Sequence, residues 1–184
     1  VRKENDEQRY NVLVLDTSAS SSFLDSSGNI FYTADTAIDY VKASAKKFIE
    51  GVQKADGTNY VAIVEYKGST ANVVSEFSTD FVSLNAAIDG LYASQNTRNV
   101  AAGLQKADTL INEISNPKAI KNVVLFTTGM TNDGEYSYDG HYNEDTIGSE
   151  WRRSDTQVRL YAYSNAAYAM AETLKSKATV YSVG

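Results

Sequence analysis

Short apolar runs and longer amphipathic segments alternate along this chain. Runs rich in Val, Ile, Leu and aromatic residues predict β-strands at residues 10–15, 60–66, 71–77, 123–126 and 179–183. The first run is apolar at nearly every position, which is typical of a strand that is covered on both faces of its sheet. A tight Lys67-Gly68 turn separates the second run from the third, so these two predict a hairpin with an antiparallel strand at the sheet edge.

Helical periodicity marks several other segments. Apolar or small residues recur there three or four positions apart, so each segment presents one apolar face. The predicted helices cover residues 34–52, 81–91, 100–114 and 160–174. Two long polar stretches, residues 21–33 and 128–158, are predicted to be loops. This order predicts an α/β fold: a doubly wound, mostly parallel sheet with one antiparallel edge strand and helices on both faces.

Size and composition favour a single globular domain. The 184 residues suffice for one domain with its own core, and neither an internal repeat nor a linker divides them. No apolar run approaches the roughly 18 residues of a membrane span. The net charge of −6 argues against a nucleic-acid partner, because phosphate binding needs clustered Lys and Arg. The absence of cysteine excludes disulfides, thiolate metal sites and cysteine nucleophiles.

Oxygen-bearing side chains follow the first predicted strand at alternating positions. The sequence Asp16-Thr17-Ser18-Ala19-Ser20 begins where the apolar run ends. In an α/β sheet, ligands bind at the carboxyl ends of the strands. A carboxylate with hydroxyls suits Mg²⁺, Mn²⁺ or Ca²⁺ rather than Zn²⁺. Capping of the following turn by the same side chains is the alternative interpretation.

Asp-x-Ser-x-Ser after a hydrophobic strand resembles the metal-ion-dependent adhesion site of von Willebrand factor type A domains. The likeness extends to residues 99–104, 123–129 and 174–184. It implies one type A-like domain over residues 1–184 that lacks the last strand and the C-terminal helix of the family. The Tyr- and Asp-rich insert and the absence of cysteine resemble the type A domains of Gram-positive surface and pilus-tip proteins.

In that family, five side chains from three loops surround the metal. The resemblance places the first three on Asp16, Ser18 and Ser20. The fourth is a threonine shortly before a helix, and Thr97 is the candidate. Counting back from the glycine of that helix places the threonine on Arg98 instead, unless the loop carries one extra residue. Both positions stay open.

The fifth position departs from the family pattern. The family has an aspartate before the glycine of the turn after its fourth strand, and here that residue is Thr128. The loss of a carboxylate removes one negative charge from around a dication and weakens its binding. A hydroxyl still ligates or holds a water. Asp133 is a nearby carboxylate, but its spacing is not that of the family.

The resemblance implies a metal-dependent adhesion domain on a bacterial cell surface. The metal would be Mg²⁺, with Mn²⁺ or Ca²⁺ as alternatives, and its open coordination position would accept an acidic group of a host or matrix protein. The domain would be extracellular and anchored to the cell wall through parts outside this chain. The departure at Thr128 supports an alternative, a metal-free structural or interaction domain that keeps the fold and has lost the site.

Enzymatic chemistry finds little support. A phosphatase of the haloacid dehalogenase type needs a second Asp two positions after the first, and Ser18 stands there. A serine hydrolase needs a base near its nucleophile. The one histidine, His141, lies in the polar insert, and the chain has no Gly-x-Ser-x-Gly elbow. Glycine-rich phosphate-binding motifs are missing as well. We therefore predict that the chain is not an enzyme.

The polar insert is a further candidate for function. Residues 133–155 carry seven acidic side chains together with Tyr136, Tyr138, Tyr142 and the sole tryptophan, Trp151. A solvated loop is one interpretation. The other is a recognition arm beside the metal site, because long loops often carry function and aromatic side chains favour binding surfaces.

Overall fold

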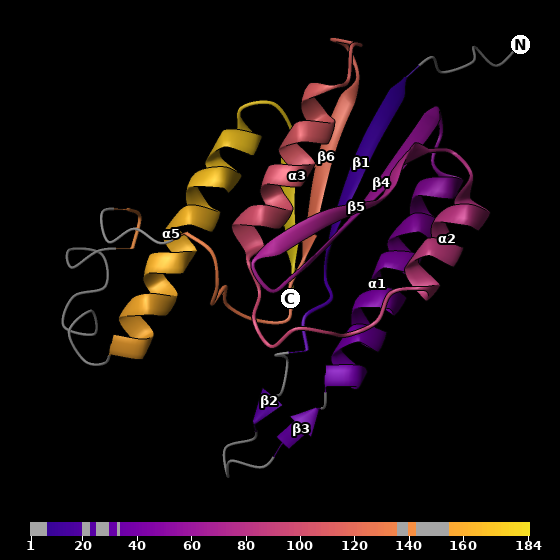
Figure 1. The fold of residues 1–184 in the computed structure, drawn as a ribbon. Helices are drawn as coiled ribbons and strands as arrows, with labels where there is room; N and C mark the ends of the chain where they lie inside the picture. The colour runs from indigo at the N-terminus through magenta and orange to yellow at the C-terminus, as the bar shows by residue number, and fades with distance from the viewer. Residues whose placement is uncertain (1–6, 20–22, 25–29, 33, 136–139, 143–154) are drawn as a thin grey trace, which may run out of the picture.

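The computed structural model describes residues 7–19, 23–24, 30–32, 34–135, 140–142 and 155–184. Within these residues the main sheet has five strands in the order β5-β4-β1-β6-β7 (Figure 1). They are β1 (Gln8–Asp16), β4 (Thr58–Lys67), β5 (Thr70–Ser78), β6 (Ile120–Phe126) and β7 (Thr179–Val183). Every pairing is parallel except that of β5, which runs antiparallel to β4 at one edge. The predicted sheet is therefore confirmed.

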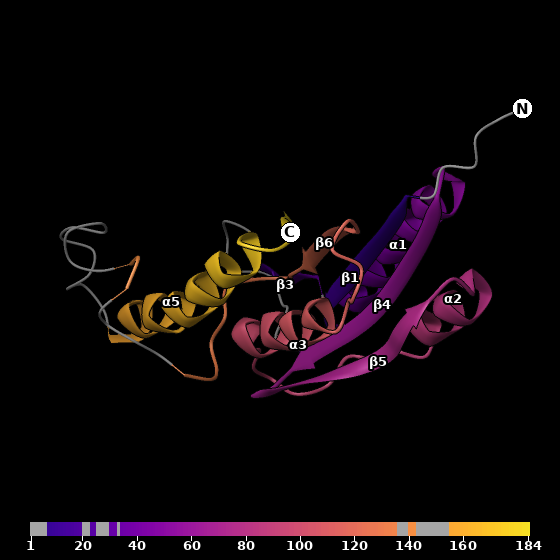
Figure 2. The same ribbon diagram turned by 90° about the horizontal axis from the view of Figure 1, so that it is seen from above.

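Helices cover both faces of this sheet, as the periodicity predicts. They are α1 (Ala34–Lys54), α2 (Phe81–Asp89), α3 (Val100–Asn112) and α5 (Asp155–Lys175). Helices α1 and α2 share one hydrophobic core with the sheet, and α3 and α5 share the core on the opposite face. Figure 2 shows this layering from above, with α3 and α1 on opposite sides of the strands.

The alternation of side chains along β1 explains why its sequence is apolar throughout. Val12 and Val14 belong to the core under α3 and α5. Leu13 and Leu15 belong to the core under α1 and α2. Adjacent residues of a strand point to opposite faces. A strand with helices on both faces therefore needs an apolar side chain at every position.

Helix α3 packs closely on the sheet at Gly103. A Cβ atom on this residue would stand 2.8 Å from Cγ1 of Val14 and 2.9 Å from Cδ1 of Tyr66. Both distances are shorter than van der Waals contact, so only glycine lets the helix and the strands approach this far. The approach fixes the start of α3, and the loop before it, against the carboxyl end of β1.

Two segments differ from the prediction. The predicted loop 21–33 contains a two-stranded antiparallel sheet, formed by β2 (Phe23–Leu24) and β3 (Ile30–Tyr32). These strands are too short to show a period, and the Ser and Gly residues near them favour a loop. Helix α5 begins inside the predicted loop 128–158. The prediction missed its first turn because residues 155–159 are mostly polar and the apolar period starts only at Leu160.

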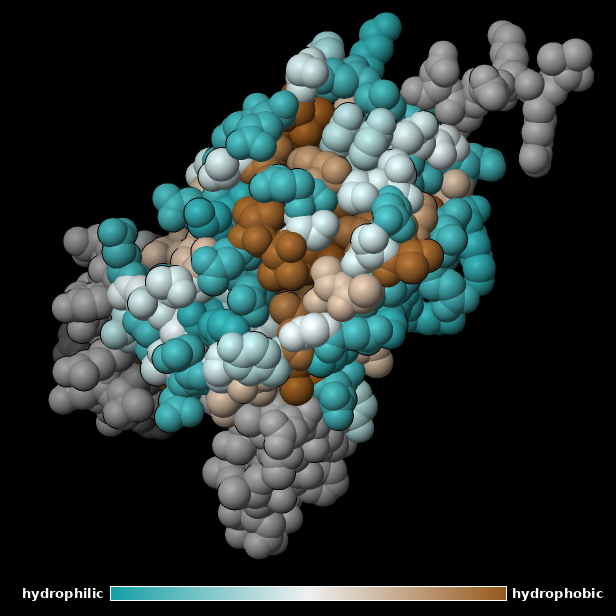
Figure 3. Space-filling model, turned by 45° about the vertical axis from the view of Figure 1, so that its right-hand side comes forward, coloured by the Kyte–Doolittle hydropathy of each residue, from teal (hydrophilic) through white to brown (hydrophobic). Residues whose placement is uncertain are grey.

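On the face seen in Figure 3, apolar residues gather in the middle and polar residues surround them. Among the described helices, none combines the length and the apolar character that crossing a membrane requires. The exposed large apolar side chains include Tyr40, Val82, Tyr92, Met130 and Tyr181.

The carboxyl ends of the central strands meet at one end of the sheet. Strand β1 ends at Asp16 and β6 ends at Phe126, on neighbouring positions of their register. The loop that leads into α3 lies beside the loop after β1, because Ser94 and Ser18 form a parallel β-bridge. We call the surface formed here the loop face, and it comprises residues 17–19, 90–99 and 127–135.

Candidate functional site

Asp16 ends β1 at the base of the loop face, and its side chain is fully buried. Oδ1 accepts hydrogen bonds from the backbone N–H of Ser18 at 3.0 Å and from its hydroxyl at 2.7 Å. Oδ2 accepts from the backbone N–H of Thr128 at 3.0 Å and from its hydroxyl at 2.7 Å. Hydrogen bonds to a carboxylate are among the stronger ones in proteins. They join the loop after β1 to the loop after β6.

Arg98 brings a positive charge to the same carboxylate. Its Nε lies 3.6 Å from Oδ2 of Asp16, and the two side chains expose 5% and 0% of their surface. The burial of two charges costs free energy that only close pairing offsets, so the loss of either partner strands the other. The pair therefore holds the loop before α3 against the end of β1.

Backbone contacts and a glycine hold Arg98 in place. Its N–H donates to Oδ1 of Asn132 at 2.8 Å, and its carbonyl accepts from the N–H of Asn132 at 3.1 Å. The hydroxyl of Thr131 donates to the same carbonyl at 3.1 Å. A Cβ atom on Gly129 would overlap Nη1 of Arg98. The guanidinium thus occupies space that exists because residue 129 is glycine.

The hydroxyl of Thr97 points to a different carboxylate. It donates to Oδ2 of Asp133 at 2.6 Å, and Oδ1 of Asp133 accepts from the N–H of Gly134 at 2.7 Å. The carbonyl of Thr97 accepts from the N–H of Gly68 at 2.7 Å. Asp133 therefore fastens the loop after β6 to the loop before α3 at a second point.

Backbone hydrogen bonds join the loop after β1 to residues 90–99. The N–H of Ser94 donates to the carbonyl of Thr17 at 3.1 Å, and the N–H of Ala19 donates to the carbonyl of Gln95 at 2.7 Å. Gln95 has a φ of 63°, in the left-handed region that residues other than glycine rarely adopt. Such a conformation persists where the surroundings over-determine it, so this contact is a fixed part of the loop face.

Tyr66 on β4 closes the base of the site. It is fully buried, and its hydroxyl donates to the carbonyl of Phe126 at 3.1 Å. Burial raises the pKa of the Tyr66 phenol well above its ordinary value, and the negative charge of Asp16 raises it further. The phenol therefore stays neutral and keeps its hydrogen bond at physiological pH.

The structure brings together three of the five residues that the resemblance places around a metal. Hydrogen bonds link Asp16 to Ser18 and to Thr128. Thr97 contacts Asp133 instead. Ser20 lies outside the described residues.

Arg98, which pairs with Asp16, is the second of the two candidates for the family threonine, the one obtained by counting back from Gly103. Arg98 directly precedes Asn99, whose Oδ1 caps α3 by accepting from the N–H of Ala102 at 3.0 Å. The count indicated the position of Arg98 but not the direction of its side chain. Arginine is mostly exposed in proteins, so the sequence holds no signal for a buried guanidinium here.

The described part of the insert beyond the loop face packs on α5. The N–H of Tyr142 donates to Oδ1 of Asn165 at 2.7 Å, and Nδ2 of Asn165 donates to the carbonyl of Tyr142 at 2.8 Å. The ring of His141 stacks on Tyr168 with 4.0 Å between centroids. Tyr136, Tyr138 and Trp151 lie outside the described residues. The recognition arm therefore stays a prediction.

The loop face matches a divalent cation only in part. Hydroxyl and carboxylate oxygens are the ligands that Mg²⁺ and Ca²⁺ prefer, and Ser18, Thr128 and Asp16 carry them. The described residues hold no cluster of three or more Asp, Glu, His or Cys side chains. N–H and O–H donors already surround both oxygens of Asp16, and the guanidinium of Arg98 would repel a dication beside it. A divalent cation does not fit beside Asp16 in this arrangement.

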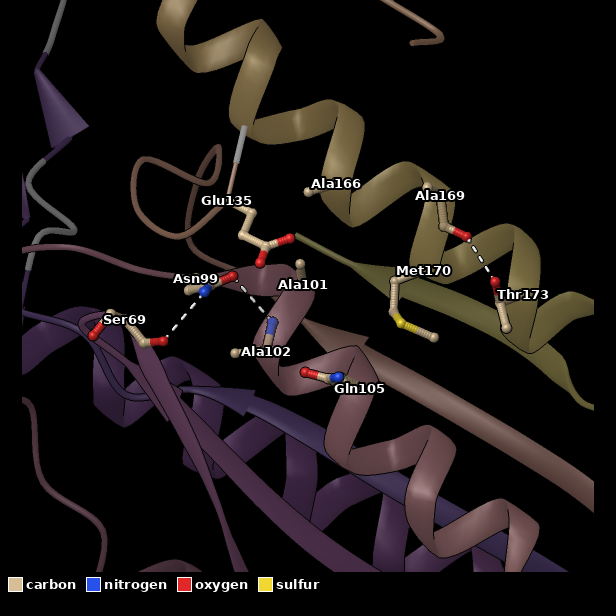
Figure 4. A pocket seen from close by; sticks show the side chains of 10 residues that line it. All are labelled: Ser69, Asn99, Ala101, Ala102, Gln105, Glu135, Ala166, Ala169, Met170 and Thr173. Atoms are coloured by element: carbon tan, nitrogen blue, oxygen red, sulfur yellow. Dashed lines mark hydrogen bonds between the residues drawn. The ribbon is translucent and has the colours of Figure 1, made fainter. Parts of the chain in front are cut away.

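The loop face also presents exposed side chains and borders a pocket. Tyr92 is 67% exposed and Met130 is 49% exposed. The ammonium of Lys67 lies 4.6 Å from the ring centroid of Tyr92. A pocket of about 460 Å³ opens between α3 and α5. Figure 4 shows Glu135 above the first turn of α3 and Met170 reaching toward the pocket from α5.

Sequence comparison finds a family and a distant relative. The family described as von Willebrand factor type A domain matches residues 11–131. The collagen alpha-1(VI) chain of Xenopus laevis is 25% identical over 99 residues, which are 53% of this chain and 10% of the relative. This chain therefore corresponds to a small part of that relative.

Solved structures with a similar fold include two pilus proteins. The PilB minor pilin from Streptococcus sanguinis matches with a TM-score of 0.69 and 18% identity, over 98% of this chain and 51% of that chain. The pilus adhesin SpaC from Lactobacillus rhamnosus GG, in its open conformation, matches with a TM-score of 0.54 and 17% identity, over 71% of this chain and 16% of that chain. At these identities the likeness shows the fold alone. This chain spans about half or less of each protein.

Proposed function

We propose that this chain, which belongs to the von Willebrand factor type A domain family, is a non-catalytic binding domain that captures a protein or matrix ligand through its loop face on a bacterial cell surface. The structural likeness to a pilus adhesin and a minor pilin supports adhesion and an extracellular location. The lack of cysteine is compatible with that location.

The observation that carries this proposal is that exposed side chains of the loop face lie on loops that buried contacts hold in place. We call the exposed residues Tyr92 and Met130 the rim, and the buried contacts beneath them the base. The base is the buried pair of Asp16 and Arg98, with the hydrogen bonds that join the three loops. The rim carries the exposed side chains of Tyr92 and Met130. Aromatic residues and methionine are enriched in protein interfaces. A surface that is already ordered loses less entropy when it binds.

In this proposal the rim, and not the buried charges, contacts the ligand. Arg98 is 4% exposed and Asp16 is 1% exposed, so neither charge reaches a partner. Tyr92 and Met130 offer apolar contact, and Glu135 offers a carboxylate at the edge of the pocket. The geometry favours a ligand surface with an apolar contact that polar groups surround.

Metal-dependent capture of an acidic group on the ligand is the second candidate. The hydroxyls of Ser18 and Thr128 and the carboxylate of Asp133 favour it, because they are hard oxygen donors suited to Mg²⁺, Mn²⁺ or Ca²⁺. It requires Arg98 to leave Asp16 first, since the guanidinium would repel the cation. The metal-independent mechanism needs no such rearrangement, and we place it first.

Adhesion of domain-coated beads separates the two candidates. Beads that carry the purified domain are applied to collagen, fibronectin, fibrinogen or laminin surfaces and to epithelial cells, in buffer with millimolar Mg²⁺ or with EDTA. We expect retention on at least one surface, and equal retention in both buffers. Retention that needs Mg²⁺ would favour the second candidate. No retention on any surface in either buffer would count against both.

Substitutions on the rim locate the contact. Tyr92→Ser and Met130→Ser each remove an exposed apolar side chain, and each should lower bead retention severalfold. Val82→Ser is the matched control, because Val82 is 82% exposed. Val82 follows the end of β5, where Ser78 pairs with Val61 near the start of β4. It therefore lies at the end of the sheet opposite to the loop face. Equal retention by the rim variants and the wild type would contradict the proposed surface.

A further inference from the structure

We propose that Arg98 is a built-in replacement for a divalent cation, so that the protein's own guanidinium holds the loop face in order. The proposal concerns how the loops are held, and it stands whether or not the face binds a ligand. Three observations carry it: the charge balance at Asp16, the chemistry of residue 128, and the space left by Gly129.

The charge balance is the first observation. A buried carboxylate needs a positive counterpart. The guanidinium of Arg98 brings one positive charge to the single negative charge of Asp16, with Nε 3.6 Å from Oδ2 and both side chains buried. The pair is neutral as built. A dication added beside this pair would stand next to the guanidinium in a low-dielectric environment, where like charges repel strongly.

The uncharged side chain of Thr128 suits a site in which a guanidinium, and not a dication, stands beside Asp16. Thr128 gives Asp16 two hydrogen bonds and no charge. A carboxylate at this position would add a second negative charge that one guanidinium does not balance but a dication does. By the count from Gly103, both positions differ from the family pattern. Arginine stands where the count places the threonine, and threonine stands in place of the aspartate.

The space for the guanidinium is built into the loop after β6. Gly129 follows Thr128 directly, and any larger residue there would overlap Nη1 of Arg98. Asn132 in the same loop clamps the backbone of Arg98 in both directions. The loop after β6, which carries the fifth metal ligand in the family, therefore provides the space and the hydrogen bonds that position Arg98 here.

This arrangement has a measurable consequence. The loop face should be ordered without metal, and positions 98 and 128 together should decide whether the site accepts one. The exchange of both residues for the family types, Arg98→Thr with Thr128→Asp, should convert the site to one that binds Mg²⁺.

Calorimetric titration with MgCl₂ and thermal unfolding test the proposal on the purified domain. For the wild type we expect no saturable Mg²⁺ binding up to millimolar concentration and the same Tm in Mg²⁺ and in EDTA. For the Arg98→Thr/Thr128→Asp variant we expect Mg²⁺ affinity about tenfold or more above that of the wild type, a difference of about 1.4 kcal/mol. Its Tm should rise when Mg²⁺ is added.

Two single variants serve as controls. Arg98→Thr alone should lower the Tm, because it strands Asp16 without a counterion. Lys177→Thr also removes a cation from a partly buried pair, with Asp108 at 2.6 Å, but away from the loop face, so it should create no response to Mg²⁺. Saturable Mg²⁺ binding by the wild type, or a wild-type Tm that EDTA lowers, would overturn the proposal. So would a folded double variant that ignores Mg²⁺, and if that variant does not fold, the wild-type titration decides.

Discussion

Thr128 and Asp16 are joined twice, because the backbone N–H and the hydroxyl of Thr128 both donate to Oδ2 of Asp16, at 3.0 Å and 2.7 Å. Ser18 makes the same double contact with Oδ1. One carboxylate therefore fastens the loops that follow β1 and β6. Arg98 balances its charge and brings in the loop before α3.

The hydroxyl of Thr128 should contribute measurably to stability. Thr128→Val keeps the shape and the backbone contact but removes one hydrogen bond to a buried carboxylate. We expect a loss of about 1.5–3 kcal/mol in the free energy of unfolding, measured with urea. Thr109→Val on α3 is the control, because the exposed Thr109 hydroxyl bonds within its own helix, to the carbonyl of Gln105 at 3.1 Å. Similar losses in the two variants would show that Asp16 does not depend on Thr128.

Two glycine substitutions should have effects of opposite sign. Gly129→Ala introduces a Cβ that overlaps Nη1 of Arg98, so the guanidinium must shift away from its seat. We expect a loss of about 1–3 kcal/mol. Gly51→Ala in α1 meets nothing within 4 Å and should gain up to about 1 kcal/mol from helix propensity. Chemical denaturation of both variants measures the difference, and a neutral Gly129→Ala would mean that the seat is not tight.

Tyr66 should make stability fall at alkaline pH. Its pKa is raised in the folded state by burial and by Asp16, so above the ordinary pKa near 10 the unfolded chain releases a proton that the folded one keeps. Stability from this group is complete below about pH 10 and is lost as the pH rises, with a slope of at most about 1.4 kcal/mol per unit. Urea unfolding between neutral pH and pH 11 should show a smaller decline for Tyr66→Phe. Identical slopes for the two proteins would contradict the shift.

The anchor of the insert on α5 should depend on one amide side chain. Asn165 contacts both backbone groups of Tyr142, at 2.7 Å and 2.8 Å. Asn165→Ala should therefore speed hydrogen exchange at the Tyr142 amide, while the amides of β1 keep their protection. Asn112→Ala, which removes an exposed side chain bonded to Asp108, is the control. Unchanged exchange at Tyr142 in Asn165→Ala would show that other contacts hold the segment.

Much of the fold follows from the periodicity of the sequence, because the buried strands and helix faces are long enough to show it. The uniformly apolar β1 indicated a strand covered on both faces, and the Lys67-Gly68 turn indicated the antiparallel edge. Strands β2 and β3 are too short to leave a pattern. The polar first turn of α5 has no apolar period, so the helix was predicted to begin later than it does.

The site was predictable in position but not in its contacts. A strand that ends in Asp16 and hydroxyl residues places Ser18 near the carboxylate by spacing alone. The pairing of Asp16 with Arg98 depends on the direction of a long side chain and on the space beside Gly129, more than a hundred positions after Asp16 in the sequence. Such a contact arises from tertiary packing, and local patterns carry no trace of it.

Hydrogen exchange at the amides of Ser18 and Thr128 tests the central claim most directly, because both N–H groups bond to Asp16. The wild-type domain is compared by NMR after exhaustive EDTA treatment and in millimolar Mg²⁺. If Arg98 holds the loop face in order, the protection of both amides is the same under the two conditions. Protection that EDTA abolishes and Mg²⁺ restores would contradict the account and show that a metal orders the site.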